Sequence, residues 1–263
     1  MPDNTAAKYF ARYLKVAPLS HALWRSVEAQ ELAKYKLEKP ILDLGCGFGE
    51  FAGVFFSSQI EVGLDIDEKE IEKAAQGGKY KKTVIADARN LPFGDNSFQT
   101  IISVSTLEHI PDNFQVFKEA KRVLKPGGKF IFMSPAEEFM RSLLLVKFLN
   151  FLGLGKVSEI YCRLLNRAFK HVFIPPEKTW VSQTTRAGLQ IEKVEGTIPR
   201  IALWIWEAGL IFALPSQITK LIFGSRLVLF PKLRFILFKP LIPFIKSDPN
   251  FRANIVVVAT KPK

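Results

Sequence analysis

The chain has 263 residues, of which 48% are hydrophobic, and it carries a formal net charge of +12. This length and composition allow one large α/β core with a smaller appended module, and they exclude a disordered or fibrous chain. The two cysteines, Cys46 and Cys162, belong to no CxxC or Cys/His cluster, which argues against a disulfide framework or a structural zinc site. The first residues contain no apolar stretch of signal-peptide length, so we expect a reducing, cytoplasmic setting.

The positive charge is concentrated in two segments of the chain. Residues 139–174 hold six basic residues and one acidic residue, and residues 199–252 hold eight basic residues and two acidic residues. The rest of the chain is therefore almost neutral. We expect any partner that binds through the positive charge to contact these two segments.

Apolar and aromatic side chains recur at helical spacing through residues 8–36, with a break at Pro18. Pro40 ends this region just before a short apolar run. The pattern predicts that residues 1–38 form a helical lid at the N-terminus.

The run from Ile41 to Gly49 reads ILDLGCGFG and predicts a buried strand followed by a turn with glycines at alternate positions. Glycine lets the backbone pass close to a ligand. A dinucleotide site would need a further glycine where Glu50 stands, so a nicotinamide or flavin dinucleotide is disfavoured. A tight turn with no ligand is the other interpretation of this stretch.

A second buried strand is expected over Glu61 to Ile66, and it brings Asp65 twenty residues past Gly45. That spacing places a carboxylate at the tip of the second strand, where it can accept hydrogen bonds from both hydroxyls of a ribose. Asp67 is a second candidate for this role, although it fits better as the N-cap of a helix over Glu68 to Gln76.

The remaining core elements follow at regular intervals. A short strand over Thr83 to Ala86 ends at Asp87, which could accept from an exocyclic amine such as that of adenine or could form an Asx turn. A fourth strand is expected over Thr100 to Val104. A helix from Asp112 then ends at the sequence KPGG, and a fifth strand is expected over Lys129 to Met133.

These motifs, taken together, resemble those of the class I S-adenosylmethionine-dependent methyltransferases. The matching runs are DLGCGFG, GLDID, IADARNLPF, SVSTLEHI and KRVLKPGGKFIFMSP, in the order and spacing of that family. The resemblance is strong over residues 40–135 and weaker over His171 to Thr197. Asn254 to Thr260 is similar to the family's last strand, which is antiparallel and inserts between the fifth and sixth strands.

The resemblance implies an α/β fold with a seven-stranded, mostly parallel, doubly wound sheet, an antiparallel last strand and helical hydrophobic insertions. The Rossmann-like core would comprise residues 39–135, 171–198 and 253–263. The two basic, hydrophobic insertions would then be residues 136–170 and 199–252.

By the same resemblance the cofactor is S-adenosylmethionine, and no metal is required. Gly45 and Gly47 would lie against its methionine part, and Asp43 would order the turn through contacts with the backbone and the cofactor's amino group. Asp65 would hold the ribose, while Asp87 and the Ala88 amide would contact adenine. The full predicted cofactor-binding set is Asp43, Gly45, Cys46, Gly47, Gly49, Asp65, Ile66, Asp87, Ala88 and Ser103.

Methylation of a hydroxyl or an acidic carbon releases a proton, so a general base is a further expectation. His109 is the candidate because it follows the fourth strand on the ligand edge, and His171 is a second candidate. The alternative role of His109 is to order the LEH turn by hydrogen bonding. Ser105 and Glu108 are expected to line the same pocket.

The two insertions place lysines and arginines every few residues within runs of leucine, phenylalanine and tryptophan. This composition is typical of helices that lie in a membrane interface, with aliphatic stems buried and charges among the headgroups. A spanning helix is disfavoured because the longest candidate, Ile201 to Pro215, is too short and contains Glu207. Packing of the insertions on each other or on a second subunit, and nucleic-acid binding, are the alternatives.

The sequence therefore predicts a methyltransferase on the cytoplasmic face of a membrane. Its acceptor would be a lipophilic small molecule, such as a quinone precursor or a prenyl- or lipid-linked head group, methylated on oxygen or carbon. An anionic membrane surface is the expected partner, and nucleic acid is disfavoured. The rival hypotheses are a soluble small-molecule methyltransferase whose insertions form a homodimer interface, and a non-catalytic, cofactor-binding assembly partner.

Overall fold

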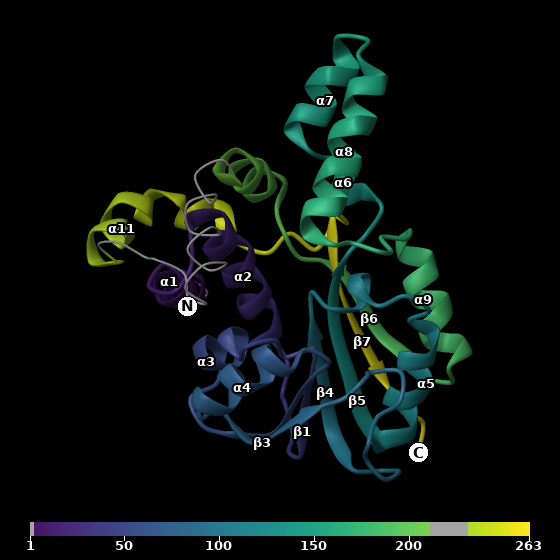
Figure 1. The fold of residues 1–263 in the computed structure, drawn as a ribbon. Helices are drawn as coiled ribbons and strands as arrows, with labels where there is room; N and C mark the ends of the chain where they lie inside the picture. Colours follow the sequence, from purple (N-terminus) through teal and green to yellow (C-terminus); the bar gives the residue numbers. More distant parts are fainter. Residues whose placement is uncertain (1–2, 211–230) are drawn as a thin grey trace.

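The computed structural model describes residues 3–210 and 231–263, and a seven-stranded sheet forms its centre (Figure 1). Its strands are β1 (Ile41–Leu44), β2 (Ile60–Asp65), β3 (Tyr80–Ile85), β4 (Phe98–Val104), β5 (Leu124–Pro135), β6 (Gln190–Gly196) and β7 (Asn254–Thr260). They lie in the order β3-β2-β1-β4-β5-β7-β6, and β7 runs antiparallel to both of its neighbours. The predicted fold class is confirmed, including the antiparallel strand inserted between the fifth and the sixth.

Alternate residues of the central strands serve two separate hydrophobic layers, as the two-residue period of a strand requires. On β5, Phe130 and Phe132 pack into one layer, while Ile131 and Met133 pack into the other. Because helices cover both faces, apolar residues stand at consecutive positions along these strands, as at Phe130–Met133 of β5.

Helices cover the two faces of the sheet unequally (Figure 1). On one face lie α5 (Phe114–Val123) and α9 (Glu177–Arg186). On the other face lie α1 (Asp3–Tyr13), α2 (Leu19–Leu32), α3 (Glu50–Phe55) and α4 (Glu68–Gln76), together with the helical residues 200–210. The helices α1 and α2 fall within the predicted lid and meet at Pro18, where the break was expected.

Most predicted element boundaries agree with the structure to within a few residues. Asp67 caps α4 as predicted, because its Oδ1 accepts from the backbone N–H groups of Lys69 and Glu70. One prediction was wrong: KPGG does not precede the fifth strand but lies inside β5, which begins at Leu124. The β4–β5 pairing shifts register there, so an irregularity absorbs the Pro-Gly-Gly sequence without ending the strand.

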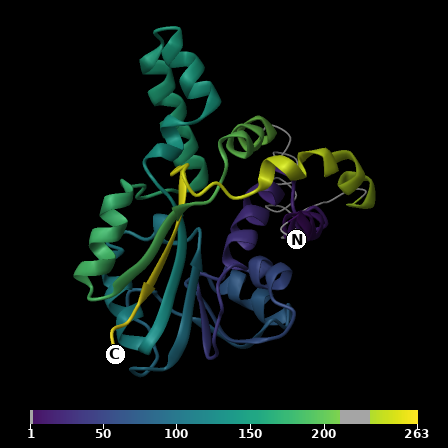
Figure 2. The ribbon, with the colours of Figure 1, turned by 180° about the vertical axis from the view of Figure 1, so that it is seen from behind.

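The first insertion projects from the end of β5. It consists of α6 (Glu138–Arg141), α7 (Leu144–Phe151) and α8 (Gly155–Phe169), and α7 and α8 form a helical hairpin that extends away from the sheet (Figures 1 and 2). No described helix is long and apolar enough to cross a bilayer.

The second insertion packs on the two N-terminal helices, α1 and α2. Its described parts are residues 200–210, α11 (Pro231–Phe238) and the 3-10 helix η2 (Lys239–Ile245). Arg234 of α11 donates to the backbone carbonyls of Leu14 and Ala17 at 2.8 Å each, which ties this insertion to α1 and the turn after it. The part of the membrane prediction that concerns residues 211–230 lies outside the described residues.

Candidate active site

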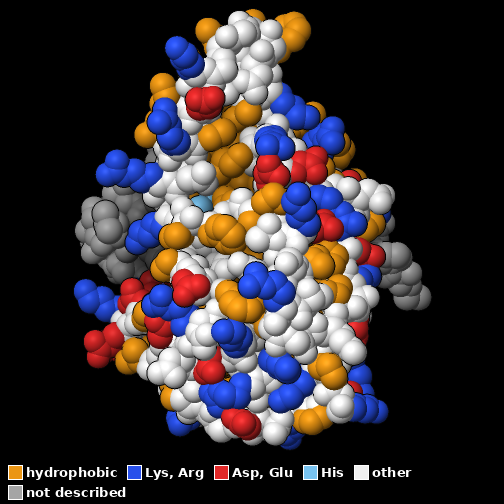
Figure 3. Space-filling view, turned by 90° about the vertical axis from the view of Figure 1, so that its right-hand side faces the viewer, with side chains coloured by type: hydrophobic (Ala, Val, Ile, Leu, Met, Phe, Trp, Pro, Cys, Tyr) orange, Lys and Arg blue, Asp and Glu red, His pale blue; other side chains and the backbone are white. Residues whose placement is uncertain are grey.

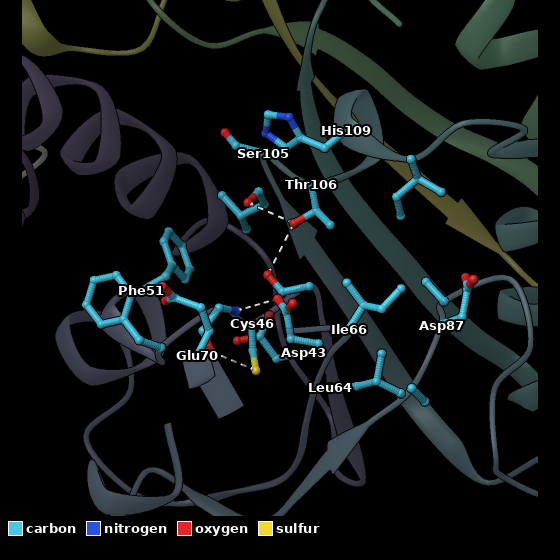
Figure 4. A pocket seen from close by; sticks show the side chains of 18 of the residues that line it. Asp43, Cys46, Phe51, Leu64, Ile66, Glu70, Asp87, Ser105, Thr106 and His109 are labelled. Atoms are coloured by element: carbon cyan, nitrogen blue, oxygen red, sulfur yellow. Dashed lines mark hydrogen bonds between the residues drawn. The ribbon is translucent and has the colours of Figure 1, made fainter. Parts of the chain in front are cut away.

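A cavity of about 500 Å³ opens at the carboxyl ends of β1, β2 and β4. The strand order reverses between β1 and β4, which is the place where open α/β sheets bind ligands. Figure 4 shows Ser105 and His109 at one end of this cavity and Asp87 near the other. We call it the cofactor cavity.

The glycine turn after β1 forms the floor of the cofactor cavity. Gly45 and Cys46 donate their N–H groups to the Leu64 carbonyl at 2.8 and 2.9 Å, which fixes the turn on β2. Gly47 adopts a φ of 51°, and a side chain built there would point into open space, with only the Glu70 carboxylate within 4 Å. Gly47 therefore leaves room for a ligand against the backbone.

Gly45 is required for a different reason from the one that the sequence suggested. Its φ is 78°, and a Cβ at this position would overlap the side chain of Thr106, whose hydroxyl donates to the Gly45 carbonyl at 3.2 Å. The turn after β1 is thus locked against the residue that follows β4.

Asp43 is buried under the glycine turn, and its partner is a side chain that the sequence did not indicate. The Tyr80 hydroxyl donates to Asp43 Oδ2 at 2.7 Å, across β2. Burial raises the pKa of Asp43 to about 6, while the hydrogen bond from Tyr80 opposes the rise. Asp43 is therefore held in position under the glycine turn by the Tyr80 hydroxyl.

Asp65 and Asp87 lie at the tips of adjacent strands, as predicted. Asp65 accepts from Gly47 N at 2.8 Å and from Asp67 N at 3.1 Å, one bond to each carboxylate oxygen. Each oxygen keeps a lone pair for a ribose hydroxyl. Asp87 forms the Asx turn that was the alternative, accepting from Arg89 N at 2.8 Å, and it also pairs with the Arg89 guanidinium. These hydrogen bonds lower the pKa of Asp87.

Helix α2 is held over the cavity by a buried carboxylate. Glu28 is fully buried and accepts from Trp24 Nε1 at 2.9 Å, Arg25 at 2.9 Å and the Ser105 hydroxyl at 2.6 Å. Ser105 has a φ of 51°, so the residue at the tip of β4 is held in the left-handed region by this contact. The Glu28 network thus joins α2 to the carboxyl end of β4.

A second, smaller cavity of about 160 Å³ adjoins the first and shares Arg25, Ser105 and His109 with it. Its walls are largely aromatic and come from distant parts of the chain: Trp24 of α2, Phe139 of α6, Phe169 of α8 and Trp206 of the second insertion. The Trp24 ring lies 5.5 Å from Phe139 and 5.4 Å from Trp206, centroid to centroid. We call it the aromatic cavity.

Both predicted histidines border the aromatic cavity. The rings of His109 and His171 stack with their centroids 5.4 Å apart. The Phe169 ring also stacks on His171, at a centroid distance of 5.7 Å. Burial lowers the pKa of His109 and lowers that of His171 to about 4, so both rings are neutral at pH 7. Burial also raises the pKa of Glu108, which contacts the same cavity, to about 8.

Most of the predicted cofactor-binding residues line the cofactor cavity, and two do not. Those that line it are Asp43, Gly45, Cys46, Gly47, Asp65, Ile66, Asp87 and Ala88. Ser103 is fully buried within β4, and Gly49 caps α3, where a side chain would press on Tyr80 and Ala74. Arg25 and Thr106 were missed. Arg25 belongs to no local motif, and Thr106 lies within SVSTLEHI, but its contact with Gly45 depends on tertiary packing.

Comparison with known sequences adds three findings. Residues 42–132 match the family described as a methyltransferase domain. The chain is similar to 27-O-demethylrifamycin SV methyltransferase of Amycolatopsis mediterranei, with 38% identity over 98 residues, which are 34% of this chain and 36% of the relative. It is also similar to demethylmenaquinone methyltransferase of Staphylococcus haemolyticus, with 27% identity over 193 residues, which are 70% of this chain and 75% of the relative.

In structure, the chain is similar to an S-adenosylmethionine-dependent methyltransferase of Thermotoga maritima that is described as a possible histamine N-methyltransferase. The TM-score is 0.60 at 22% identity, and the match covers 92% of this chain and 91% of the other. This likeness extends the shared fold beyond the core motifs to most of the chain.

Proposed function

We propose that the chain, whose residues 42–132 match a methyltransferase domain, is a class I S-adenosylmethionine-dependent enzyme that methylates a lipophilic small molecule at the cytoplasmic face of a membrane. The acceptor we propose is a quinone precursor or a prenyl- or lipid-linked head group, methylated on oxygen or carbon. The observation that carries this proposal is the aromatic cavity, because it opens directly beside the cofactor cavity.

The cofactor cavity fits S-adenosylmethionine. Gly47 leaves space for a ligand against the backbone, and Asp65 keeps a lone pair on each oxygen for the ribose hydroxyls. Asp43 offers a buried carboxylate near the glycine turn for the positive charge of the amino acid part. When bound, this cofactor supplies an electrophilic sulfonium methyl, which an acceptor lone pair takes as the carbon–sulfur electron pair returns to sulfur.

The chain's own contribution to such a reaction is orientation and exclusion of water. Trp24 and the Glu28 network close the lid over the junction of the two cavities. The Nδ1 of His109 lies 3.0 Å from the Lys170 carbonyl, so Nδ1 carries the ring proton and Nε2 keeps its lone pair. His109 Nε2 is thus available to accept a proton from the acceptor.

A flat, apolar acceptor suits the aromatic cavity. Two tryptophans and two phenylalanines surround it, and ring-to-ring packing favours a planar, conjugated molecule over a sugar or a nucleotide. Two relatives are named for rifamycin and menaquinone methylation, and their named substrates are consistent with such an acceptor.

Membrane association is supported by the surface of the helical hairpin formed by α7 and α8. Phe151 is 86% exposed at its tip, and Phe148 and Leu164 are 55% and 60% exposed. Exposed lysines and arginines flank these side chains: Lys147, Lys156, Arg163 and Arg167. Figure 3 shows hydrophobic side chains between basic ones over the projecting end of the molecule. An interfacial helix needs this combination of apolar and basic groups.

Incubation of the purified chain with methyl-labelled cofactor and fractionated cell extract tests the proposal. We expect label to enter the lipid-soluble fraction and to stay out of the aqueous fraction. Trp206→Leu should raise the acceptor KM while leaving the cofactor Kd unchanged, because Trp206 borders only the aromatic cavity. Label confined to aqueous products would contradict the proposal, and cofactor binding without any methyl transfer would favour a non-catalytic role.

A further inference from the structure

Three potential metal ligands meet at the edge of the aromatic cavity. One carboxylate oxygen of Glu108 and one ring nitrogen each from His109 and His171 lie within 4.8 Å of one another. His109 Nε2 is 3.9 Å from Glu108 Oε1. The three residues come from the 3-10 helix after β4, η1 (Leu107–His109), and from the segment that follows α8.

Hydrogen bonds set the tautomers of both histidines in the way that metal ligation requires. The Nδ1 of His109 faces the Lys170 carbonyl at 3.0 Å, and the Nδ1 of His171 faces the Asn166 side-chain oxygen at 3.1 Å. A nitrogen that faces a carbonyl oxygen must carry the proton, so each ring keeps its lone pair on Nε2. Metal-ligating histidines are oriented by this kind of outer contact.

The third ligand, the Glu108 carboxylate, is also fixed in position by its surroundings. Glu108 is 1% exposed, and the Ser134 hydroxyl donates to its Oε2 at 3.1 Å. Within the described residues, no lysine or arginine forms an ion pair with this carboxylate. The backbone carbonyl of Glu108 also accepts from Val172 N and Phe173 N at 2.9 and 3.0 Å, which fixes the segment bearing His171 beside η1.

We propose that Glu108, His109 and His171 bind a divalent first-row transition cation, with its open coordination positions facing the aromatic cavity. Two imidazoles and one carboxylate form a donor set that suits Zn²⁺, Fe²⁺ or Co²⁺ better than Mg²⁺ or Ca²⁺. Ligands at ~2.1 Å from such an ion lie roughly 3.0 to 3.4 Å apart, so the three side chains must close by about 1 Å. The packing of His171 against Phe169 and Phe139 keeps the rings near that arrangement.

The cation would bind an oxygen atom of the acceptor at an open position. As a Lewis acid it would lower the pKa of the acceptor's hydroxyl group, whose proton would pass to water, and the resulting oxyanion would favour methylation on oxygen. His109 would then act as a ligand and not as a proton acceptor, so the two roles of its Nε2 exclude each other.

A Co²⁺ titration of the chelator-treated protein tests this site without methyl transfer. We expect one Co²⁺ per chain, seen as visible d–d absorption, and displacement of it by Zn²⁺. The chain has three histidines, so His21→Ala is the matched control and should keep the signal, whereas His171→Ala should lose it. Asn166→Ala should weaken binding by roughly 10- to 100-fold, because it releases the His171 ring.

Folding of each variant is checked by calorimetry with S-adenosylhomocysteine, because His171 lies outside the cofactor cavity. Three outcomes would overturn the metal site: no Co²⁺ binding by the wild-type protein, equal binding by His171→Ala, or equal loss in His21→Ala. Each of these outcomes leaves the proposed methylation of a lipophilic acceptor intact, so the two proposals fail separately.

Discussion

A buried acid at the floor of the cofactor cavity should make cofactor binding depend on pH. Asp43 has its pKa raised to about 6 by burial, and the nearby Arg25 opposes this rise while Asp65 adds to it. The ionised form of Asp43 attracts the cationic cofactor. Affinity for S-adenosylmethionine should therefore increase as pH rises through about 6 and level off above 7.

The Tyr80→Phe variant separates Asp43 from other titrating groups. The Tyr80 hydroxyl donates to Asp43 and lowers its pKa, so removing that hydroxyl should move the midpoint of the pH dependence upward. Calorimetric titrations between pH 5 and pH 8 measure the shift. An affinity that is the same for both proteins at every pH would show that Asp43 does not bind the cofactor's cationic group.

Two glycines offer a matched test of the turn after β1. Gly45→Ala places a methyl group on the Thr106 side chain and forces an alanine to a φ of 78°, so we expect a loss of roughly 2 kcal/mol or more in unfolding free energy. Gly53→Ala lies within α3 with no atom close to its added Cβ, and it should stabilise by about 0.5 to 1 kcal/mol. Urea denaturation measures the unfolding free energy of both variants. If the two substitutions change it by the same amount and in the same direction, the role of Thr106 is refuted.

At the scale of single elements, the attachment of α2 depends on Glu28. Glu28→Gln keeps the size of the side chain but leaves Arg25 without its carboxylate, so we expect a loss of about 3 kcal/mol. Ser105→Ala removes one hydrogen bond to the same carboxylate and should cost about 1 kcal/mol. Amide hydrogen exchange in α2 should become faster in Glu28→Gln than in Ser105→Ala; the same rate in both would mean that the network does not hold the lid.

The sequence predicts those elements whose cause is local. The glycine turn and the cap at Asp67 each follow from neighbouring residues, and the structure confirms them. The KPGG prediction was wrong because Pro-Gly-Gly marks only the end of a helix. It does not show whether a turn or a strand follows, and here β5 begins directly after α5. Leu124 leaves α5 and already pairs with Phe98, so sheet pairing overrides the turn signal.

The parts of the site that the sequence does not predict are assembled from distant segments. Trp24 and Trp206 are 182 positions apart in the sequence, yet their ring centroids lie 5.4 Å apart. His109 and His171 were each proposed as a base from local sequence, but their stacking depends on the contact of residues 172 and 173 with Glu108. No periodicity reports such contacts, because they arise when the first insertion folds back onto the edge of the sheet.

At the scale of the whole molecule, the membrane proposal concerns the projecting hairpin of α7 and α8. An apolar tip with basic flanks should bind anionic vesicles at low salt and release them as salt screens the charge. Phe151→Asp should reduce the vesicle-bound fraction by roughly tenfold or more. It removes an exposed phenylalanine whose burial in the membrane would be worth ~1.5 to 3 kcal/mol, and it adds a charge of the same sign as that of the vesicle.

Flotation with phosphatidylglycerol vesicles measures this binding, and Ile85→Asp provides its control. Ile85 is 52% exposed on the edge strand β3, far along the sheet from the hairpin, so the same substitution there should leave vesicle binding unchanged. A protein that stays unbound at low salt would contradict membrane association. If its mass in detergent-free buffer is that of a dimer, and Phe151→Asp yields a monomer, then a second copy of the chain covers the hairpin and the acceptor must reach the aromatic cavity from solution.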